Sequence, residues 1–92
     1  MKFMSTWTLL PGSVKDAAEQ FLAQGGGEPE GVTVLGRWHN VDCSGGFTLF
    51  ESSNLAALHL GAAKWADLLE ITILPVIEDS EAGPNLVATF KK

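Results

Sequence analysis

The stretch Val32-Thr-Val-Leu-Gly-Arg-Trp-His-Asn40 and the stretch Gly46-Phe-Thr-Leu-Phe-Glu-Ser52 are both rich in β-branched and aromatic residues. They are separated by the five residues Val41-Asp-Cys-Ser-Gly45, and Asp, Ser and Gly favour turns. Because so short a connection pairs two strands antiparallel, the sequence predicts a hairpin whose strands are residues 32–40 and 46–52.

A strand and a helix are expected before this hairpin. Residues Lys2–Leu10 are β-prone and stop at Pro11-Gly12, which predicts a first strand. Apolar residues at helical spacing then predict a helix over residues 13–24, with Phe21 as a buried core aromatic. Three glycines at 25–27 end this helix and lead into a solvated loop.

A helix and a strand are expected after the hairpin. Apolar spacings of three and four predict a second helix over residues 54–67. Residues Leu69–Glu78 are β-prone, and Pro75 within them favours an edge strand or a bulge. Residues 79–84 are a polar break, and Leu86–Phe90 suits either a short helix or an added strand, so residues 79–92 are expected as a tail outside a core of about residues 1–78.

The resulting order is βαββαβ, the ferredoxin-like α+β arrangement, with two helices on one face of a four-stranded antiparallel sheet. A chain of 92 residues has room for one hydrophobic core, so we expect a single domain over residues 1–92. The first and fourth strands carry large apolar side chains on both faces. We therefore expect a homodimer in which a second copy covers the helix-free face.

Charge and composition exclude several classes of function. The net charge of −5 and the scattered lysines argue against a nucleic-acid partner, and no apolar run is long enough for a membrane span. One cysteine excludes an internal disulfide framework, so a cytoplasmic location is expected. The sequence also lacks the spacing of a zinc site and the strand-to-helix glycine loop of a nucleotide site, so we expect no metal and no cofactor.

Short stretches along the chain carry a resemblance to a known family. They are Met1-Lys-Phe-Met4 with Trp7, Leu35-Gly-Arg-Trp-His39, Ser44-Gly-Gly-Phe47, Glu51, and Trp65 with Asp67-Leu-Leu69, followed by Pro75-Val76. Together they resemble a small bacterial domain-of-unknown-function family that is placed among the dimeric α/β-barrel proteins, over the chain to about residue 78. The resemblance implies a ferredoxin-like protomer that dimerises through its open sheet face. The wider superfamily includes small monooxygenases, haem-degrading enzymes, lactone isomerases and binding proteins, so the resemblance implies a pocket without assigning a reaction.

The candidate site is centred on Arg37 and His39, which are two residues apart and point to the same side of a strand. If the fourth strand presents Glu70 and Thr72 on that side, a pocket forms on the helix-free surface of the sheet. Arg37 would then bind an anionic group and His39 would relay a proton, oriented by Glu70 or Glu51. The alternative is a structural role, in which Arg37 forms a cross-strand ion pair with a glutamate at the dimer rim.

The three tryptophans divide between core and pocket in this interpretation. Trp65 lies on the apolar face of the second helix, and Trp38 is on the same side of its strand as Val34, so both are expected in the core, while Trp7 is a candidate wall of the pocket. The function expected from the sequence is binding of a small organic anion or aromatic ligand by a dimer. The alternative is a cofactor-independent isomerase or monooxygenase-like enzyme that uses His39 and Arg37.

Overall fold

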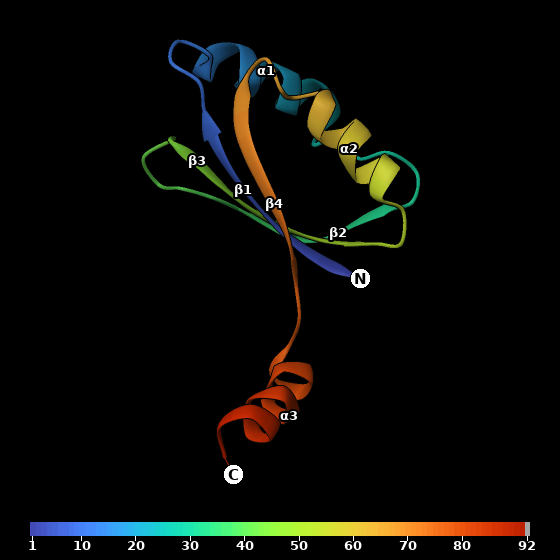
Figure 1. Ribbon diagram of the computed structural model, residues 1–92. Helices are drawn as coiled ribbons and strands as arrows, with labels where there is room; N and C mark the ends of the chain where they lie inside the picture. Colours follow the sequence, from blue (N-terminus) through green and yellow to red (C-terminus); the bar gives the residue numbers. More distant parts are fainter. Residues whose placement is uncertain (92) are drawn as a thin grey trace.

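Seven helices and strands follow one another along residues 1–91, the part of the chain that this computed structural model describes (Figure 1). The predicted βαββαβ order is confirmed, and the fold is ferredoxin-like α+β, with one further helix at the C-terminus. The elements are β1 (Lys2–Leu9), α1 (Val14–Gln24), β2 (Val32–His39), β3 (Gly45–Ser52), α2 (Leu55–Ala63), β4 (Leu69–Val76) and α3 (Asp79–Phe90).

The four strands form one antiparallel sheet in the order β2-β3-β1-β4. Figure 1 shows α1 and α2 on the same face of this sheet, so the opposite face is open within one chain. Pro75 lies in β4 at the edge of the sheet, where its missing amide hydrogen interrupts no inner ladder, as its position in the sequence predicts.

The second helix is shorter than predicted, because α2 ends at Ala63 and not at residue 67. Residues 64–68 form turns, in which the amides of Leu68 and Leu69 both donate to the Trp65 carbonyl. Trp65 and Leu69 nevertheless line the same cavity. The apolar spacing therefore continues past the last helical residue, and periodicity alone overestimates the length of the helix.

The C-terminal segment differs most from the prediction. Residues 79–84, expected as a polar break, are the first half of α3, and residues 86–90 complete the same helix. Acidic residues in the first turn favour a helix N-terminus, and the amides of Glu81 and Ala82 both donate to the Glu78 carbonyl. Gly83 and Pro84 lie inside the helix, where such residues ordinarily signal an end, so the local signal was misleading.

A β-bulge in β2 decides which side chains face the helices. Val34 pairs with Phe50, but Gly36 and not Leu35 pairs with Leu49, so the alternation of the strand shifts by one residue. After this shift Arg37 and His39 face the helices, and Trp38 faces the open side of the sheet, where 56% of its surface is exposed. The expectation that Trp38 is a core residue on the same side as Val34 is therefore wrong.

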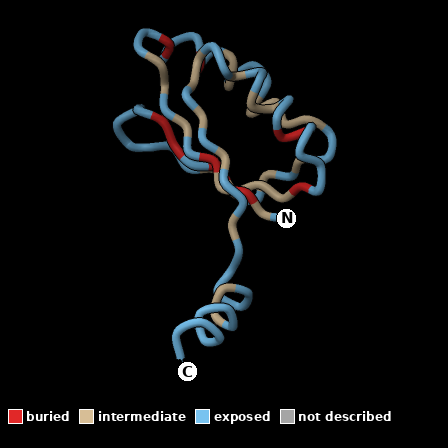
Figure 2. Tube along the Cα trace, in the orientation of Figure 1, coloured by how far each residue is buried: buried red, intermediate tan, exposed pale blue. Residues whose placement is uncertain are grey.

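The layer between the sheet and the helices is loosely filled. Among residues 1–91, four hydrophobic residues are buried, Phe3, Ala17, Ala57 and Leu58, and Figure 2 shows how short the buried segments of the chain are. Phe21, expected as a core aromatic, is half-buried. The two layers thus enclose a cavity in place of a packed core.

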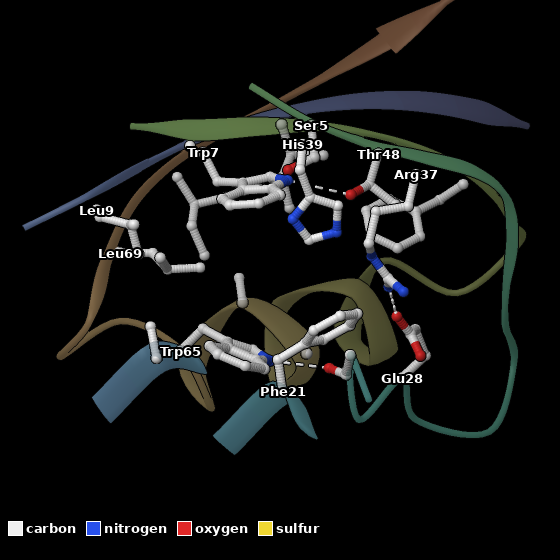
Figure 3. Close-up of a pocket in the computed structure, with 18 of the residues that line it drawn as sticks. Ser5, Trp7, Leu9, Phe21, Glu28, Arg37, His39, Thr48, Trp65 and Leu69 are labelled. Atoms are coloured by element: carbon white, nitrogen blue, oxygen red, sulfur yellow. Dashed lines mark hydrogen bonds and ion pairs between the residues drawn. The ribbon is translucent and has the colours of Figure 1, made fainter. Parts of the chain in front are cut away.

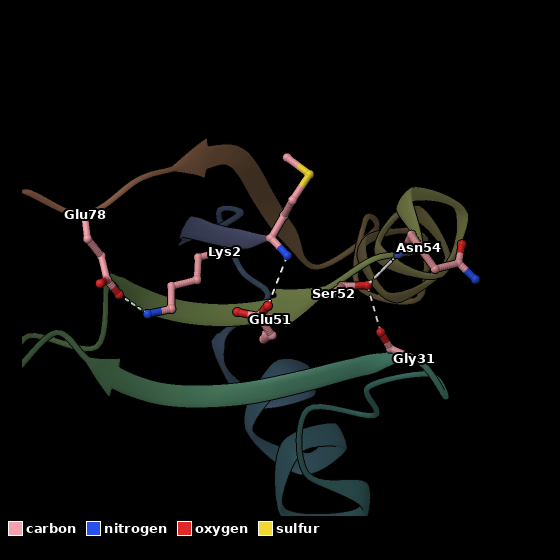
Figure 4. Close-up of polar contacts among 7 residues, drawn as sticks. Lys2, Gly31, Glu51, Ser52, Asn54 and Glu78 are labelled. Carbon is pink, nitrogen blue, oxygen red and sulfur yellow. Dashed lines mark hydrogen bonds and ion pairs between the residues drawn. The ribbon is translucent and has the colours of Figure 1, made fainter. Parts of the chain in front are cut away.

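Hydroxyl and amide side chains hold the loops that join the layers. The Ser13 hydroxyl lies 2.7 Å from the Leu10 carbonyl oxygen and 2.8 Å from that of Leu68, which ties the end of β1 to the start of β4. The Ser52 hydroxyl donates to the Gly31 carbonyl (Figure 4). The Asn54 side chain accepts from the Ala57 amide at the start of α2. These contacts position the helices above the sheet.

Candidate functional site

A cavity of about 350 Å³ lies between the sheet and the helices α1 and α2. Figure 3 shows Trp7 and His39 on the sheet side, facing Phe21 and Trp65 on the helix side. Leu9 and Leu69 lie at one end of the view and Arg37 and Glu28 at the other, so the cavity has an apolar end and a charged end.

Glycine makes room for the aromatic wall of the sheet side. Trp7 and His39 both pair with Gly46, from the strands on either side of it, and their ring centres meet 5.3 Å apart in an edge-on arrangement. A Cβ atom at Gly46 would lie 2.5 Å from the Trp7 ring and would collide with the Trp38 carbonyl oxygen. Only glycine therefore lets these two rings lie side by side in the cavity.

Two hydroxyl groups lie on the sheet side of the cavity. Ser5 on β1 pairs with Thr48 on β3, both line the cavity, and each is only 3% exposed. The Thr48 hydroxyl accepts a hydrogen bond from the Trp7 indole at 3.2 Å, which leaves its own proton available to donate. Within residues 1–91 the Ser5 hydroxyl enters no hydrogen bond with another protein group. No buried side-chain nitrogen or oxygen of these residues lacks a hydrogen-bond partner, so the Ser5 oxygen is accessible from the cavity, where a guest molecule can hydrogen-bond to it.

The charge of Arg37 is already paired. Its guanidinium forms an ion pair with Glu28 from the loop between α1 and β2, and it lies over the Phe21 ring at 5.4 Å from the ring centre. Both partners of the ion pair are about three-quarters buried, with side chains 23% and 25% exposed. An anionic ligand would compete with Glu28 for this cation.

The glycine loop that was expected to be only solvated takes part in the site. The Gly26 carbonyl accepts from the Trp65 indole at 2.8 Å, and the Gly27 carbonyl accepts from Lys64 at 3.1 Å. A Cβ atom at Gly26 would collide with the Glu28 carboxylate and the Arg37 guanidinium. The loop therefore fixes one aromatic wall and leaves space for the ion pair.

The structure separates the six residues expected in the site into two groups. Arg37, His39 and Trp7 line the cavity. Glu70 and Thr72 pair with Thr8 and Thr6 of β1, so they lie on the open face and not beside Arg37. The cavity therefore lies on the helix side of the sheet and not on the expected helix-free side. The strand pairing across β3 and β1 puts the polar residues of β2 and those of β4 on opposite faces.

The remaining candidate, Glu51, also lies outside the cavity. It pairs with Lys2 on the open face, and its carboxylate accepts from the N-terminal amine of Met1 at 3.0 Å (Figure 4). Arg37 does pair with a glutamate, as the structural alternative expected, but the partner is Glu28 in a loop and not a cross-strand residue.

Several lining residues were missed by sequence reasoning. Ser5 carried a usable signal, since it is a small polar residue on an otherwise apolar strand face with Phe3, Trp7 and Leu9. The sequence contains no comparable signal for Thr48 or Glu28, because their roles depend on which strand or loop the fold brings next to them. Trp65 and Phe21 were expected to fill the core, and both instead line the cavity.

Residues 1–91 contain no cluster of three His, Cys, Asp or Glu side chains that could hold a metal ion. No helix in this part of the chain is long and apolar enough to cross a membrane.

A family model described as a domain of unknown function, DUF3303, matches residues 1–90. A search of curated proteins found no match.

Proposed function

Since the chain belongs to the DUF3303 family, a domain of unknown function, we propose from its own geometry that it binds a small, uncharged, largely apolar organic molecule in the cavity between the sheet and the helices. The observation that carries this proposal is that two hydroxyl-bearing residues of low exposure, Ser5 and Thr48, line a cavity in which the Arg37 cation is already paired with Glu28.

The size and walls of the cavity support a flat guest. Its volume of about 350 Å³ falls at the lower end of the range of ligand sites, about 300–1,000 Å³. Trp7, Trp65 and Phe21 supply aromatic surface on both sides. Rings of this kind bind a planar apolar molecule by burying its faces and edges.

The charges of the site favour a neutral guest over an anion. A carboxylate that enters an apolar cavity loses its hydration, and the loss is compensated only by a free cation or several hydrogen-bond donors. Arg37 is engaged by Glu28, and the chain as a whole has a net charge of −5. Of the two ligand classes expected from the sequence, we therefore propose the aromatic one.

The surroundings of His39 support binding more than proton transfer. Its ring contacts Trp7 and Phe21, each with ring centres 5.3 Å apart, and within residues 1–91 no carboxylate hydrogen-bonds to it. A carboxylate partner would orient the imidazole for the proton transfer of an isomerase or monooxygenase-like reaction. We also propose a reducing, cytoplasmic location, with which the exposed free thiol of Cys43 is compatible.

The proposal predicts a preference between two ligands that share the same naphthalene ring. By isothermal titration calorimetry, 2-naphthol should bind at least about tenfold more tightly than 2-naphthoate, because only the naphthoate must be desolvated as an anion. Ser5→Ala should weaken 2-naphthol binding by about three- to tenfold, since it removes one hydrogen bond.

Two further variants serve as controls for this measurement. Thr6→Val removes a hydroxyl from the next residue of β1, which faces the open side, and should leave binding unchanged. Glu28→Gln frees the Arg37 cation and should raise the affinity for 2-naphthoate. If the wild type prefers naphthoate, or if neither compound saturates the protein, the proposed function is wrong.

A further inference from the structure

One row of paired residues brings the two hydroxyls of the cavity together. Residues that pair directly across neighbouring strands share a face of the sheet, and this row consists, from β2 to β4, of Arg37, Thr48, Ser5 and Ile73. All four line the cavity. On the same face, Phe50 lies two residues along β3 from Thr48, and Trp7 lies two residues along β1 from Ser5. The two hydroxyls therefore lie between aromatic side chains.

The Trp7 indole determines the direction of the Thr48 hydroxyl. An indole N–H group can only donate, and that of Trp7 donates to Thr48 Oγ1 at 3.2 Å (Figure 3). The Thr48 proton must then point away from the indole. A hydroxyl that accepts one hydrogen bond also becomes a stronger donor of the next. Thr48 therefore offers a hydrogen-bond donor to the cavity.

Ser5 can donate to the same place as Thr48. The two residues pair directly, so their Cβ atoms are about 4.5–5.5 Å apart. Within residues 1–91 no hydrogen bond joins the two hydroxyls. A hydroxyl donates over about 2.8 Å, so both groups can reach one atom of a guest that lies between them.

The number of protons decides which group fits between the two hydroxyls. A carbonyl oxygen has two lone pairs and no proton, so it accepts from both hydroxyls at once. An alcohol or a phenol adds a third proton, and without a hydrogen bond between Ser5 and Thr48 one proton then has no acceptor within the row. The other two residues of the row, Arg37 and Ile73, have side chains without acceptor atoms. A donor that is left unpaired in a buried site lowers the affinity.

The charges of the row favour a carbonyl over a carboxylate. An oxygen of either group can accept two hydrogen bonds, but only the carboxylate brings a full charge that must be desolvated. Arg37, which follows Thr48 in the row, is already paired with Glu28. A neutral carbonyl needs no counter-ion.

Resting on the proposed function, which places a neutral guest in this cavity, we propose that the guest is a planar aromatic carbonyl compound. Its oxygen accepts hydrogen bonds from Thr48 and Ser5, and its ring lies among the aromatic walls of the cavity. Trp7 is one of these walls, and it is also a positioning residue, because its indole fixes Thr48 as a donor.

The test compares a ketone with the alcohol of the same carbon skeleton. By isothermal titration calorimetry, 2-acetonaphthone should bind the wild type at least about threefold more tightly than 1-(2-naphthyl)ethanol. Thr48→Val removes the hydroxyl and should weaken ketone binding by about three- to tenfold, whereas Thr48→Ser keeps the hydroxyl and should preserve the preference for the ketone. Thr6→Val, on the open face, should leave both affinities unchanged.

The carbonyl stretching frequency of bound 2-acetonaphthone reports the hydrogen bonds independently of affinity. In isotope-edited infrared spectra, this frequency should be lower in the wild-type complex than in a hydrocarbon solvent. Ser5→Ala and Thr48→Val should each reverse part of the shift. Trp7→Phe keeps an aromatic ring but removes the indole donor, so it should also reverse part of the shift although both hydroxyls remain.

The outcomes separate this inference from the proposed function. If 2-naphthol binds but the ketone is not preferred over the alcohol, or if the stretch of the bound ketone equals that in hydrocarbon solvent, the carbonyl assignment is overturned and the proposed function stands. If Trp7→Phe leaves the shift unchanged, the positioning role of Trp7 is overturned. If none of the three compounds binds, both the inference and the proposed function are wrong.

Discussion

Replacing Gly46 by valine should lower the free energy of unfolding by about 3 kcal/mol or more. A side chain at this position collides with the backbone carbonyl of Trp38, which cannot move without breaking the β2–β3 pairing, and with the Trp7 ring. In a domain of this size the loss corresponds to a fall in melting temperature of about 12–24 °C.

Thermal unfolding followed by circular dichroism measures this effect. The matched control is Thr33→Val, which puts the same side chain at an exposed position of the neighbouring strand and should shift the melting temperature by only a few degrees. If the two variants melt at similar temperatures, the close meeting of Trp7 and His39 over Gly46 is not a feature of the folded protein.

Truncation of Phe3 to alanine should be the most costly change among the phenylalanines, at about 3–5 kcal/mol. Phe3 is 4% exposed and is the largest of the four buried hydrophobic residues. Phe21, to which the sequence pattern assigns a similar cost, is half-buried at the side of the cavity, so we expect at most about half of that loss. Urea unfolding of the two alanine variants gives both values.

The contrast between the two phenylalanines is the informative result. A loss for Phe21→Ala equal to that for Phe3→Ala would mean that α1 packs tightly on the sheet. The cavity described between the layers would then be closed in solution.

The order of elements could be predicted because its signals are local. Turn residues at Pro11-Gly12 and in the 41–45 segment, together with the apolar spacing of each run, are sufficient for the βαββαβ order. The helical structure of residues 79–90 could not be predicted in the same way. Gly83 and Pro84 are local signals for a helix end, and yet they lie inside the helix.

The site was predicted only in part because it depends on the register between strands. The bulge between Val34 and Gly36 turns Arg37 and His39 toward the helices. The alternation of side chains along a strand does not reveal where such an extra residue is inserted. Glu70 is separated from Arg37 by two intervening strands, and its face is decided by the pairing across both of them. The ion pair with Glu28 depends on a loop conformation that no spacing encodes.

Intermolecular nuclear Overhauser effects with 2-naphthol test most directly whether the cavity between the sheet and the helices is the ligand site. We expect contacts from the ligand's ring protons to the indole protons of Trp7 and Trp65 and to the methyl group of Thr48, which line the cavity. Contacts confined to Trp38 and Phe47, which lie on the open face, or no contacts at all under saturating ligand, would contradict it.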